Sequence, residues 1–150
     1  MLAITTFLKR GLVTELGSMI GIGKESDIYI CRGPVPRDEE EKKEEEQSDS
    51  LAEFETPMRT MVIKLARLGR VSFRAVKEKR DYLKHRTTSN WLYLSRLASM
   101  KEFGFMKVLH ARHFPIPEPI DWNRHAVLME HIDAVPMRNV TDMAHPIKVY

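Results

Sequence analysis

The sequence predicts an α+β fold in which a twisted antiparallel sheet packs against one long helix. Residues 12–31, 60–66 and 114–132 contain the alternating or β-branched segments that are typical of strands. Residues 89–114 instead repeat apolar side chains at three- and four-residue spacing, which is the helical period. A chain of 150 residues is long enough for one buried core. Strands on both sides of a single long helix, with no internal repeat, therefore predict one α+β layer.

The first elements are short. Residues 2–10 predict a helix that Gly11 ends as a C-terminal cap. "LVTEL" (12–16) and "SMIGIG" (18–23) predict short strands, and "DIYIC" (27–31) predicts a stronger one by its alternation.

Residues 33–58 are an acidic insertion. Residues 38–55 hold ten Asp and Glu against two Lys, a net charge of −8, although the whole chain has +3. Such dense like charge between prolines cannot bury enough apolar surface to become ordered, so we expect a disordered insertion between two strands. It is either a solvated spacer or a segment that folds back on basic residues 67–86 and competes with an RNA or ribosomal partner.

The second half begins with a strand through about Ala66, closed by Gly69. Residues 67–86 have helical composition and a net charge of +6. The long helix follows, with Ser89 or Asn90 as its N-terminal cap. Its apolar stripe consists of Leu94, Leu97, Ala98, Phe105, Val108 and Leu109. Residues 114–132 then predict a β-hairpin, which begins with prolines that forbid a helix.

Several classes of protein are excluded or disfavoured by composition. The single cysteine, Cys31, excludes an internal disulfide and a multi-cysteine zinc site. No apolar run approaches the roughly 20 residues that span a bilayer, and the first residues lack the pattern of a signal peptide. His110 and His113 lack a third ligand, so we expect no metal site. We therefore expect an intracellular protein without a membrane partner.

The stretch "IGIGKESDIYI" is the first candidate for chemistry. It is not a Walker A loop, because Ser18 stands where a glycine belongs and Glu25 follows Lys24. It is not a dinucleotide fingerprint either, because Ser26 replaces the third glycine and a strand follows. A glycine hairpin remains, which either holds phosphates with backbone N–H groups and a hydroxyl or is an ordinary tight turn.

Lys64 and Glu102 are the second candidate. In "MVIKLA", Lys64 shares a strand face with apolar Val62 and Ala66, so that face is not plainly solvated and the lysine would require an anion. Glu102 borders the apolar stripe of the long helix and could supply it. The alternative is that both side chains reach water. A contact pair is attractive by only ~4 kcal/mol at an effective dielectric of about 20, before desolvation is subtracted, so it would orient the lysine rather than stabilise the fold.

Glycine hairpin, strand lysine, helix glutamate and the strand end "LMEHI" follow the order of a protein-kinase N-terminal lobe. The strings "GIGKESDIYI", "WLYLSRLASMKEFGFMKVL" and "PIPEPIDWNRHAVLMEHID" closely resemble the atypical RIO kinases, specifically their type-two branch with a winged-helix domain. The resemblance runs from about residue 2 to residue 143. It implies that residues 1–19 are the end of a winged-helix domain, 20–143 the kinase N-lobe and 144–150 the start of a C-lobe.

The resemblance also implies an ATP site. Ser26 would contact the phosphates with Lys24 nearby, and Lys64 would bind phosphate while Glu102 holds it. Met129 would stand at the back of the adenine pocket, and backbone groups of Glu130 and Ile132 would hydrogen-bond the adenine edge. The apolar walls would be Ile22, Ile28 and Ile63.

The sequence lacks two motifs that are typical of this family. The "HGDFNEFN"-like loop with the catalytic aspartate and the "DFP"-like motif with the metal-binding aspartate do not occur before the last residue, Tyr150. We therefore assign no catalytic residue and no metal ligand, although Mg²⁺ is expected for the family. Phosphoryl transfer depends on both aspartates, so we expect these residues alone to be inactive.

Two functions follow. The first is the ATP-binding lobe of a RIO-type serine/threonine kinase or ATPase, which would need the C-lobe of the same kinase. The resemblance associates such a kinase with pre-40S ribosomal particles in the cytoplasm and also the nucleus. The second is a non-catalytic module that docks on rRNA or ribosomal proteins through residues 67–86, by salt-sensitive phosphate contacts. The coding sequence after Tyr150 would separate them.

Overall fold

The computed structural model describes residues 2–35, 57–67, 90–136 and 139–140. Nearly all of the acidic insertion, the basic segment 67–86 beyond Arg67, and residues 144–150 lie outside these ranges. The elements in chain order are α1 (Leu2–Lys9), β1 (Glu15–Ile22), β2 (Ser26–Pro34), β3 (Met58–Ala66), α4 (Trp91–Ala111), β4 (Pro119–Asn123) and β5 (Ala126–Glu130).

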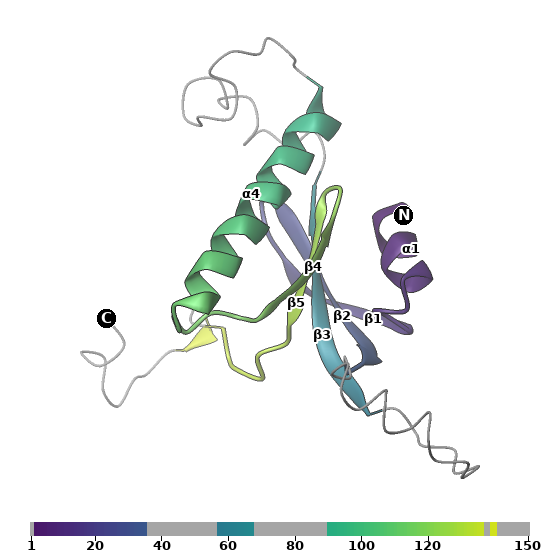
Figure 1. Cartoon of the computed structure of the whole chain (residues 1–150), viewed down its shortest axis with the longest axis vertical. Coiled ribbons are helices and arrows are strands. Elements are labelled where there is room, and N and C mark those ends of the chain that lie inside the picture. Colours follow the sequence, from purple (N-terminus) through teal and green to yellow (C-terminus); the bar gives the residue numbers. More distant parts are fainter. Residues whose placement is uncertain (1, 36–56, 68–89, 137–138, 141–150) are drawn as a thin grey trace, which may run out of the picture.

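The five strands form one sheet in the order β1-β2-β3-β5-β4, and every neighbouring pair is antiparallel. α4 lies across one face of this sheet and α1 lies on the other face (Figure 1). This arrangement confirms the predicted α+β class with one long helix. No helix in the described ranges is both long and apolar enough to cross a membrane.

The larger core lies between α1 and the sheet. Its fully buried side chains include Phe7 from α1, Met61 and Ile63 from β3, and Leu128 from β5. Gly11 has φ 70°, the left-handed conformation of the expected C-terminal cap.

The segment after α1 then crosses β2 closely. A Cβ on Gly33 would lie 2.1 Å from the carbonyl oxygen of Leu12, so only glycine fits there.

Two polar contacts connect α1 to the edge strand β4. Arg10 Nη1 lies 2.6 Å from Asp121 Oδ2, and Asn123 Nδ2 donates to the carbonyl oxygen of Ala3 at 3.0 Å. These contacts join the N-terminal helix and the residue after it to a strand more than 100 residues later in the sequence.

The second core is smaller and faces α4. Val62, Val127 and Met129 are buried there, with Phe103, Met106, Trp122 and Ile28 packed against them. Asn90 caps α4, because its side chain accepts a hydrogen bond from the backbone N–H of Leu92 at 3.0 Å.

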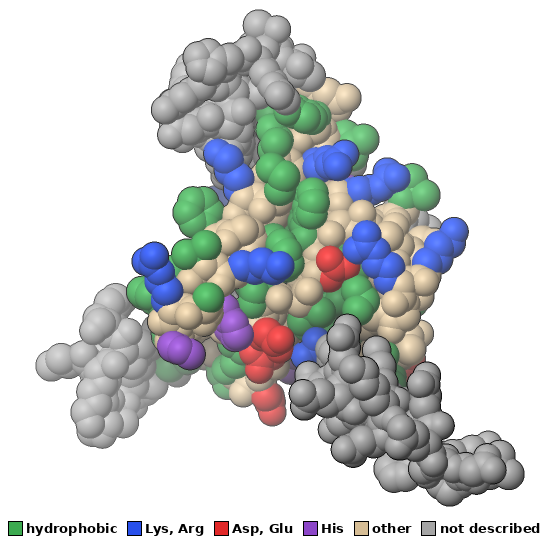
Figure 2. All heavy atoms as spheres, in the orientation of Figure 1, with side chains coloured by type: hydrophobic (Ala, Val, Ile, Leu, Met, Phe, Trp, Pro, Cys, Tyr) green, Lys and Arg blue, Asp and Glu red, His purple; other side chains and the backbone are tan. Residues whose placement is uncertain are grey.

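The sheet-facing stripe of α4 differs from the expected one. Phe105 and Val108 are 67% and 53% exposed, whereas Ser95 and Ser99 are buried and Phe103 packs against the sheet. Leu94 is buried as expected. Leu97, Ala98 and Leu109 are half-buried, so the expected stripe is correct in part and wrong at Phe105 and Val108. Apolar residues occur on both faces of this helix, and Figure 2 shows hydrophobic side chains exposed along α4.

The first strand also differs in detail. The segments 12–16 and 18–23 were expected as two strands, but Glu15–Ile22 forms one strand with register shifts between Leu16 and Gly21. Val13 instead enters the α1-side core.

Burial raises the pKa of the Cys31 thiol to about 11. The thiolate is the nucleophile, and at pH 8 only roughly one thiol in a thousand would be ionised. We expect native protein to resist iodoacetamide at pH 8 and denatured protein to react at its one cysteine, as measured by mass spectrometry over time. Equal rates in the native and denatured states would contradict the burial of this side chain.

Candidate nucleotide-binding site

The glycine stretch forms the expected hairpin between β1 and β2. The backbone N–H of Gly23 donates to the carbonyl oxygen of Ser26 at 2.8 Å and closes the turn. A Cβ on Gly23 would lie 2.9 Å from that same oxygen, closer than real Cβ contacts, so the turn requires glycine. Lys24 is exposed on this turn, and Ser26 begins β2.

Arg67 holds this hairpin against the end of β3. Its backbone N–H donates to the carbonyl oxygen of Glu25 at 2.7 Å, and its Nε donates to Asp27 Oδ2 at 2.7 Å. The hydrogen bond that Arg67 donates to Asp27 raises the pKa of Arg67, so the guanidinium stays charged. The turn is therefore connected to the strand that carries Lys64 by both backbone and side-chain bonds. No local sequence pattern indicates this contact, since it joins residues 40 positions apart.

Lys64 and Glu102 meet between the sheet and α4. The Nζ of Lys64 donates to Glu102 Oε1 in a short ion pair, which confirms that these two side chains are brought together. Lys64 lies opposite Ile28 on β2 and opposite Val127 on β5, so it occupies the middle of the sheet. Its face is the one that α4 covers.

The ion pair is only partly shielded from water. Both side chains are 34% exposed, and ion pairs with such exposure contribute about 1 kcal/mol or less to stability. The pair therefore orients the lysine ammonium more than it stabilises the fold. Part of the Lys64 side chain remains accessible to solvent.

The apolar residues around Lys64 differ from the expected walls in one respect. Ile28 and Met129 lie on the same face as Lys64 and belong to its cluster. Ile63 does not: it is completely buried on the α1 side of the sheet, because strand side chains alternate between faces. Val62 occupies the Lys64 face instead. The period-two alternation of "MVIKLA" could have identified Val62 in place of Ile63 as a wall.

The chain leaves β5 in an extended conformation. Glu130 exchanges backbone and side-chain hydrogen bonds with Glu118, at 2.9 Å and 3.0 Å. The carbonyl of Ile132 accepts from Ala134, but the N–H of Ile132 has no partner among the residues that the structure describes. Ile22 ends β1 with its side chain 59% exposed, so it contributes little to a closed wall.

No group of three or more His, Cys, Asp or Glu side chains in the described parts of the chain is arranged to hold a metal ion. A cavity of about 520 Å³ lies elsewhere, at the start of α4, and none of the residues expected for ATP lines it. The site at Lys64 is thus defined by the hairpin, the ion pair and the apolar cluster.

Comparison with known proteins gives the family context. A family profile described as the RIO domain matches residues 40–150. The serine/threonine-protein kinase rio2 of Dictyostelium discoideum is 45% identical over 149 residues, which cover 99% of this chain and 24% of that protein. The RIO2 kinase of Saccharomyces cerevisiae is 40% identical over 152 residues, 99% of this chain and 30% of that protein.

A solved structure is similar over the same range. It is the crystal structure of the Rio2 kinase–ADP/Mg²⁺–phosphoaspartate complex from Chaetomium thermophilum, with a TM-score of 0.65 and 44% identity. The match covers 99% of this chain and 37% of the other. The chain therefore spans about a quarter to two-fifths of the length of these relatives.

The ion pair makes a testable prediction about stability. Glu102→Gln should lower the free energy of unfolding in urea by about 1 kcal/mol or less, because the pair is partly solvated. The matched control Leu128→Ala removes a fully buried side chain and should cost about 2–5 kcal/mol. A loss for Glu102→Gln as large as that of the control would show that the pair is a stability element.

Proposed function

The chain belongs to the RIO domain family, and from this premise we propose that residues 20–143 form the ATP-binding lobe of a RIO-type serine/threonine kinase or ATPase. The relatives named above are serine/threonine-protein kinases. The observation that carries the proposal is the ion pair between Lys64 and Glu102. It holds an ammonium beside the glycine hairpin, on the face of the sheet that also carries an apolar cluster.

The phosphates would lie between the hairpin and Lys64. Backbone N–H groups of the turn, the hydroxyl of Ser26 and the exposed ammonium of Lys24 supply donors for phosphate oxygens. Lys64 adds a charge-assisted hydrogen bond, and Glu102 keeps its ammonium in place. Glu102 accordingly positions the lysine and need not touch the nucleotide.

The adenine would lie against Ile28, Val62 and Met129, which supply the apolar surface. The carbonyl of Glu130 and the N–H of Ile132, which has no partner in the described part of the chain, would then hydrogen-bond the adenine edge. An exposed donor that has no internal partner is available to a ligand without breaking a protein hydrogen bond. The available N–H is stronger support for an adenine contact at Ile132 than the position of Ile132 after β5 in the sequence.

Mg²⁺ would arrive with the nucleotide. The Chaetomium relative is a complex with ADP and Mg²⁺, whereas the described residues contain no acidic cluster for the metal. A bound Mg²⁺ would neutralise phosphate charge, and its protein ligands would come from outside the site described above. Neither the "HGDFNEFN"-like loop nor the "DFP"-like motif occurs in the 150 residues.

The wider role follows from the resemblance. We place the complete kinase in the cytoplasm and also the nucleus, in maturation of the small ribosomal subunit on pre-40S particles. Residues 67–86, with a net charge of +6, are the candidate contact with rRNA. Loss of pre-40S co-sedimentation on neutralising this segment would support that role, and unchanged co-sedimentation would contradict it.

Nucleotide binding gives a direct test. Lys64→Met should weaken the binding of a fluorescent ATP analogue about ten- to a hundred-fold, because a charge-assisted hydrogen bond contributes roughly 1.5–3 kcal/mol. Glu102→Gln should weaken it less. Lys9→Met, at the exposed end of α1, is the matched control and should bind normally. Equal affinities of Lys64→Met and the control for the ATP analogue would show that Lys64 does not belong to the ATP site.

Turnover gives a separate test. With saturating ATP and Mg²⁺, the purified 150-residue chain should release no phosphate above the rate of a blank. Phosphate release that disappears in Lys64→Met would show that these residues catalyse the reaction by themselves.

A further inference from the structure

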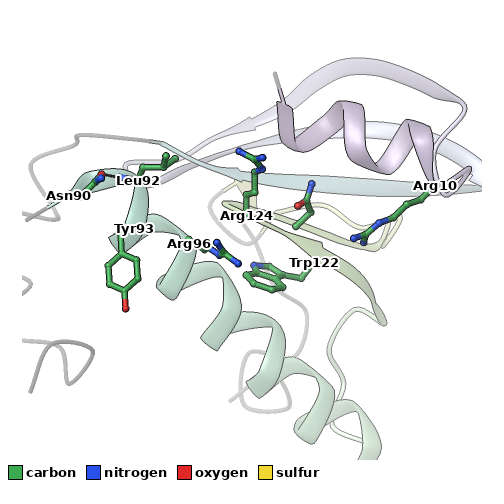
Figure 3. Close-up of a pocket in the computed structure, with 8 residues that line it drawn as sticks. Arg10, Asn90, Leu92, Tyr93, Arg96, Trp122 and Arg124 are labelled. Carbon is green, nitrogen blue, oxygen red and sulfur yellow. Dashed lines mark hydrogen bonds between the residues drawn. The ribbon is translucent and has the colours of Figure 1, made fainter. Parts of the chain in front are cut away.

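A second candidate site is the cavity of about 520 Å³ at the start of α4. Three elements line it: the end of α1 with Arg10, the first turns of α4 with Arg96, and the β4–β5 turn with Arg124. Its volume falls in the range of small-molecule sites. Figure 3 shows Arg96 and Arg10 extending toward Trp122 from opposite sides, with Arg124 between them in this view. None of these residues belongs to the ATP site proposed above.

The charges around the cavity are not balanced. Arg10 is paired with Asp121 at 2.6 Å, but neither Arg96 nor Arg124 has a carboxylate within ion-pair distance in the described part of the chain. Arginine binds phosphate with two parallel hydrogen bonds, and two unpaired guanidinium groups on one cavity repel each other until an anion joins them. The cavity therefore favours a phosphate-bearing ligand.

The walls add aromatic and polar groups. The guanidinium of Arg96 lies 5.9 Å from the centre of the Trp122 ring. Trp122 Nε1 is buried and has no hydrogen-bond partner among the residues that can be described. Because this nitrogen is fully buried, it does not open onto the cavity, and a ligand there would contact the ring of Trp122 instead. A flat ring beside cations is also the surface on which nucleobases stack.

A strand of nucleic acid fits these features better than an isolated phosphate. In the sequence, the segment 67–86, with eight Lys and Arg, ends four residues before Asn90 on the cavity wall. In Figure 2, the part of the visible face where α4 begins shows Lys and Arg side chains but no described Asp or Glu. Positive charge therefore extends beyond the cavity itself, as a polyanion requires.

We propose that the cavity bounded by Arg10, Arg96, Arg124 and Trp122 binds a phosphate of a single-stranded nucleic acid, with a base against its aromatic wall. The contact is made by Arg96 and Arg124, and Trp122 supplies the ring. Arg10 remains with Asp121 and borders the site. The cavity and the ATP site at Lys64 share no residue, so the cavity can be tested while the ATP site is filled.

The test measures fluorescence anisotropy of a labelled ten-nucleotide single strand, as RNA and as DNA of the same sequence, on the purified full chain. An excess of a non-hydrolysable ATP analogue keeps the ATP site filled. The variants are Arg96→Gln, Arg124→Gln and the double substitution. Arg112→Gln, at the opposite end of α4, is the matched control because it removes the same charge from the same helix. Circular dichroism melting verifies that each variant is folded.

The double variant should bind about ten-fold more weakly at low salt. Its plot of log affinity against log salt concentration should be shallower by about 0.7, because the double variant loses the one phosphate contact in the cavity and each such contact on a single strand contributes about 0.7 to that slope. The Arg112→Gln control should change neither value. Tighter binding of RNA than of DNA would identify a ribose contact, and equal binding would identify phosphate and base alone; both support the site.

Three outcomes would overturn the proposal. One is an unchanged salt slope in the double variant. Another is an equal loss in Arg112→Gln, which would show that only net charge matters. The third is simple competition, in which the apparent Kd of the strand keeps rising in proportion to the concentration of the ATP analogue, because that would place the strand in the ATP site.

Discussion

The ion pair between Lys64 and Glu102 is the constraint on which the α4 face of the molecule depends. α4 meets the sheet through the small side chains of Ser95 and Ser99 and through a modest apolar cluster that includes Phe103. Burial of small area gives little preference for one rotation of a helix over another. A directional ion pair does, since turning α4 by one residue, about 100°, would carry the carboxylate away from the ammonium. The pair thus adds a directional preference to the rotation of α4 that its packing against the sheet allows.

Side chains alternate between the two faces of β3, so one face packs in the larger core and the other carries Lys64. Met61 and Ile63 point into the larger core against α1, whereas Val62 and Lys64 point toward α4. The α1 side therefore supplies most of the hydrophobic stabilisation of the sheet. The α4 side can then hold a partly exposed charge and a less complete core without loss of the fold.

Structural features that depend on residues close together in the sequence could be predicted from residue types and spacing. The cap at Asn90, the glycine turn and the conformation of Gly11 follow from residue types and spacing. The face of α4 could not be predicted in the same way, because Phe105 is apolar and exposed while Ser99 is polar and buried. Helix rotation is decided by the partner surface, and that surface forms only after strands distant in sequence pair.

One row of residues across the sheet joins the two sites. Gly21, Ile28, Lys64, Val127 and Trp122 lie opposite one another on successive strands, from the glycine hairpin to the cavity wall. α4 packs on the β5 and β4 end of this row and reaches Lys64 through Glu102. Its Arg96 and Glu102 are six residues apart, about 9 Å along the helix. A ligand at the cavity that prefers one position of α4 must therefore prefer one position of the Glu102 carboxylate. By linkage, a nucleotide that holds Lys64 and Glu102 together would change the affinity of the cavity by the same factor. The packing of α4 against the row, rather than a separate pathway, is what would couple them.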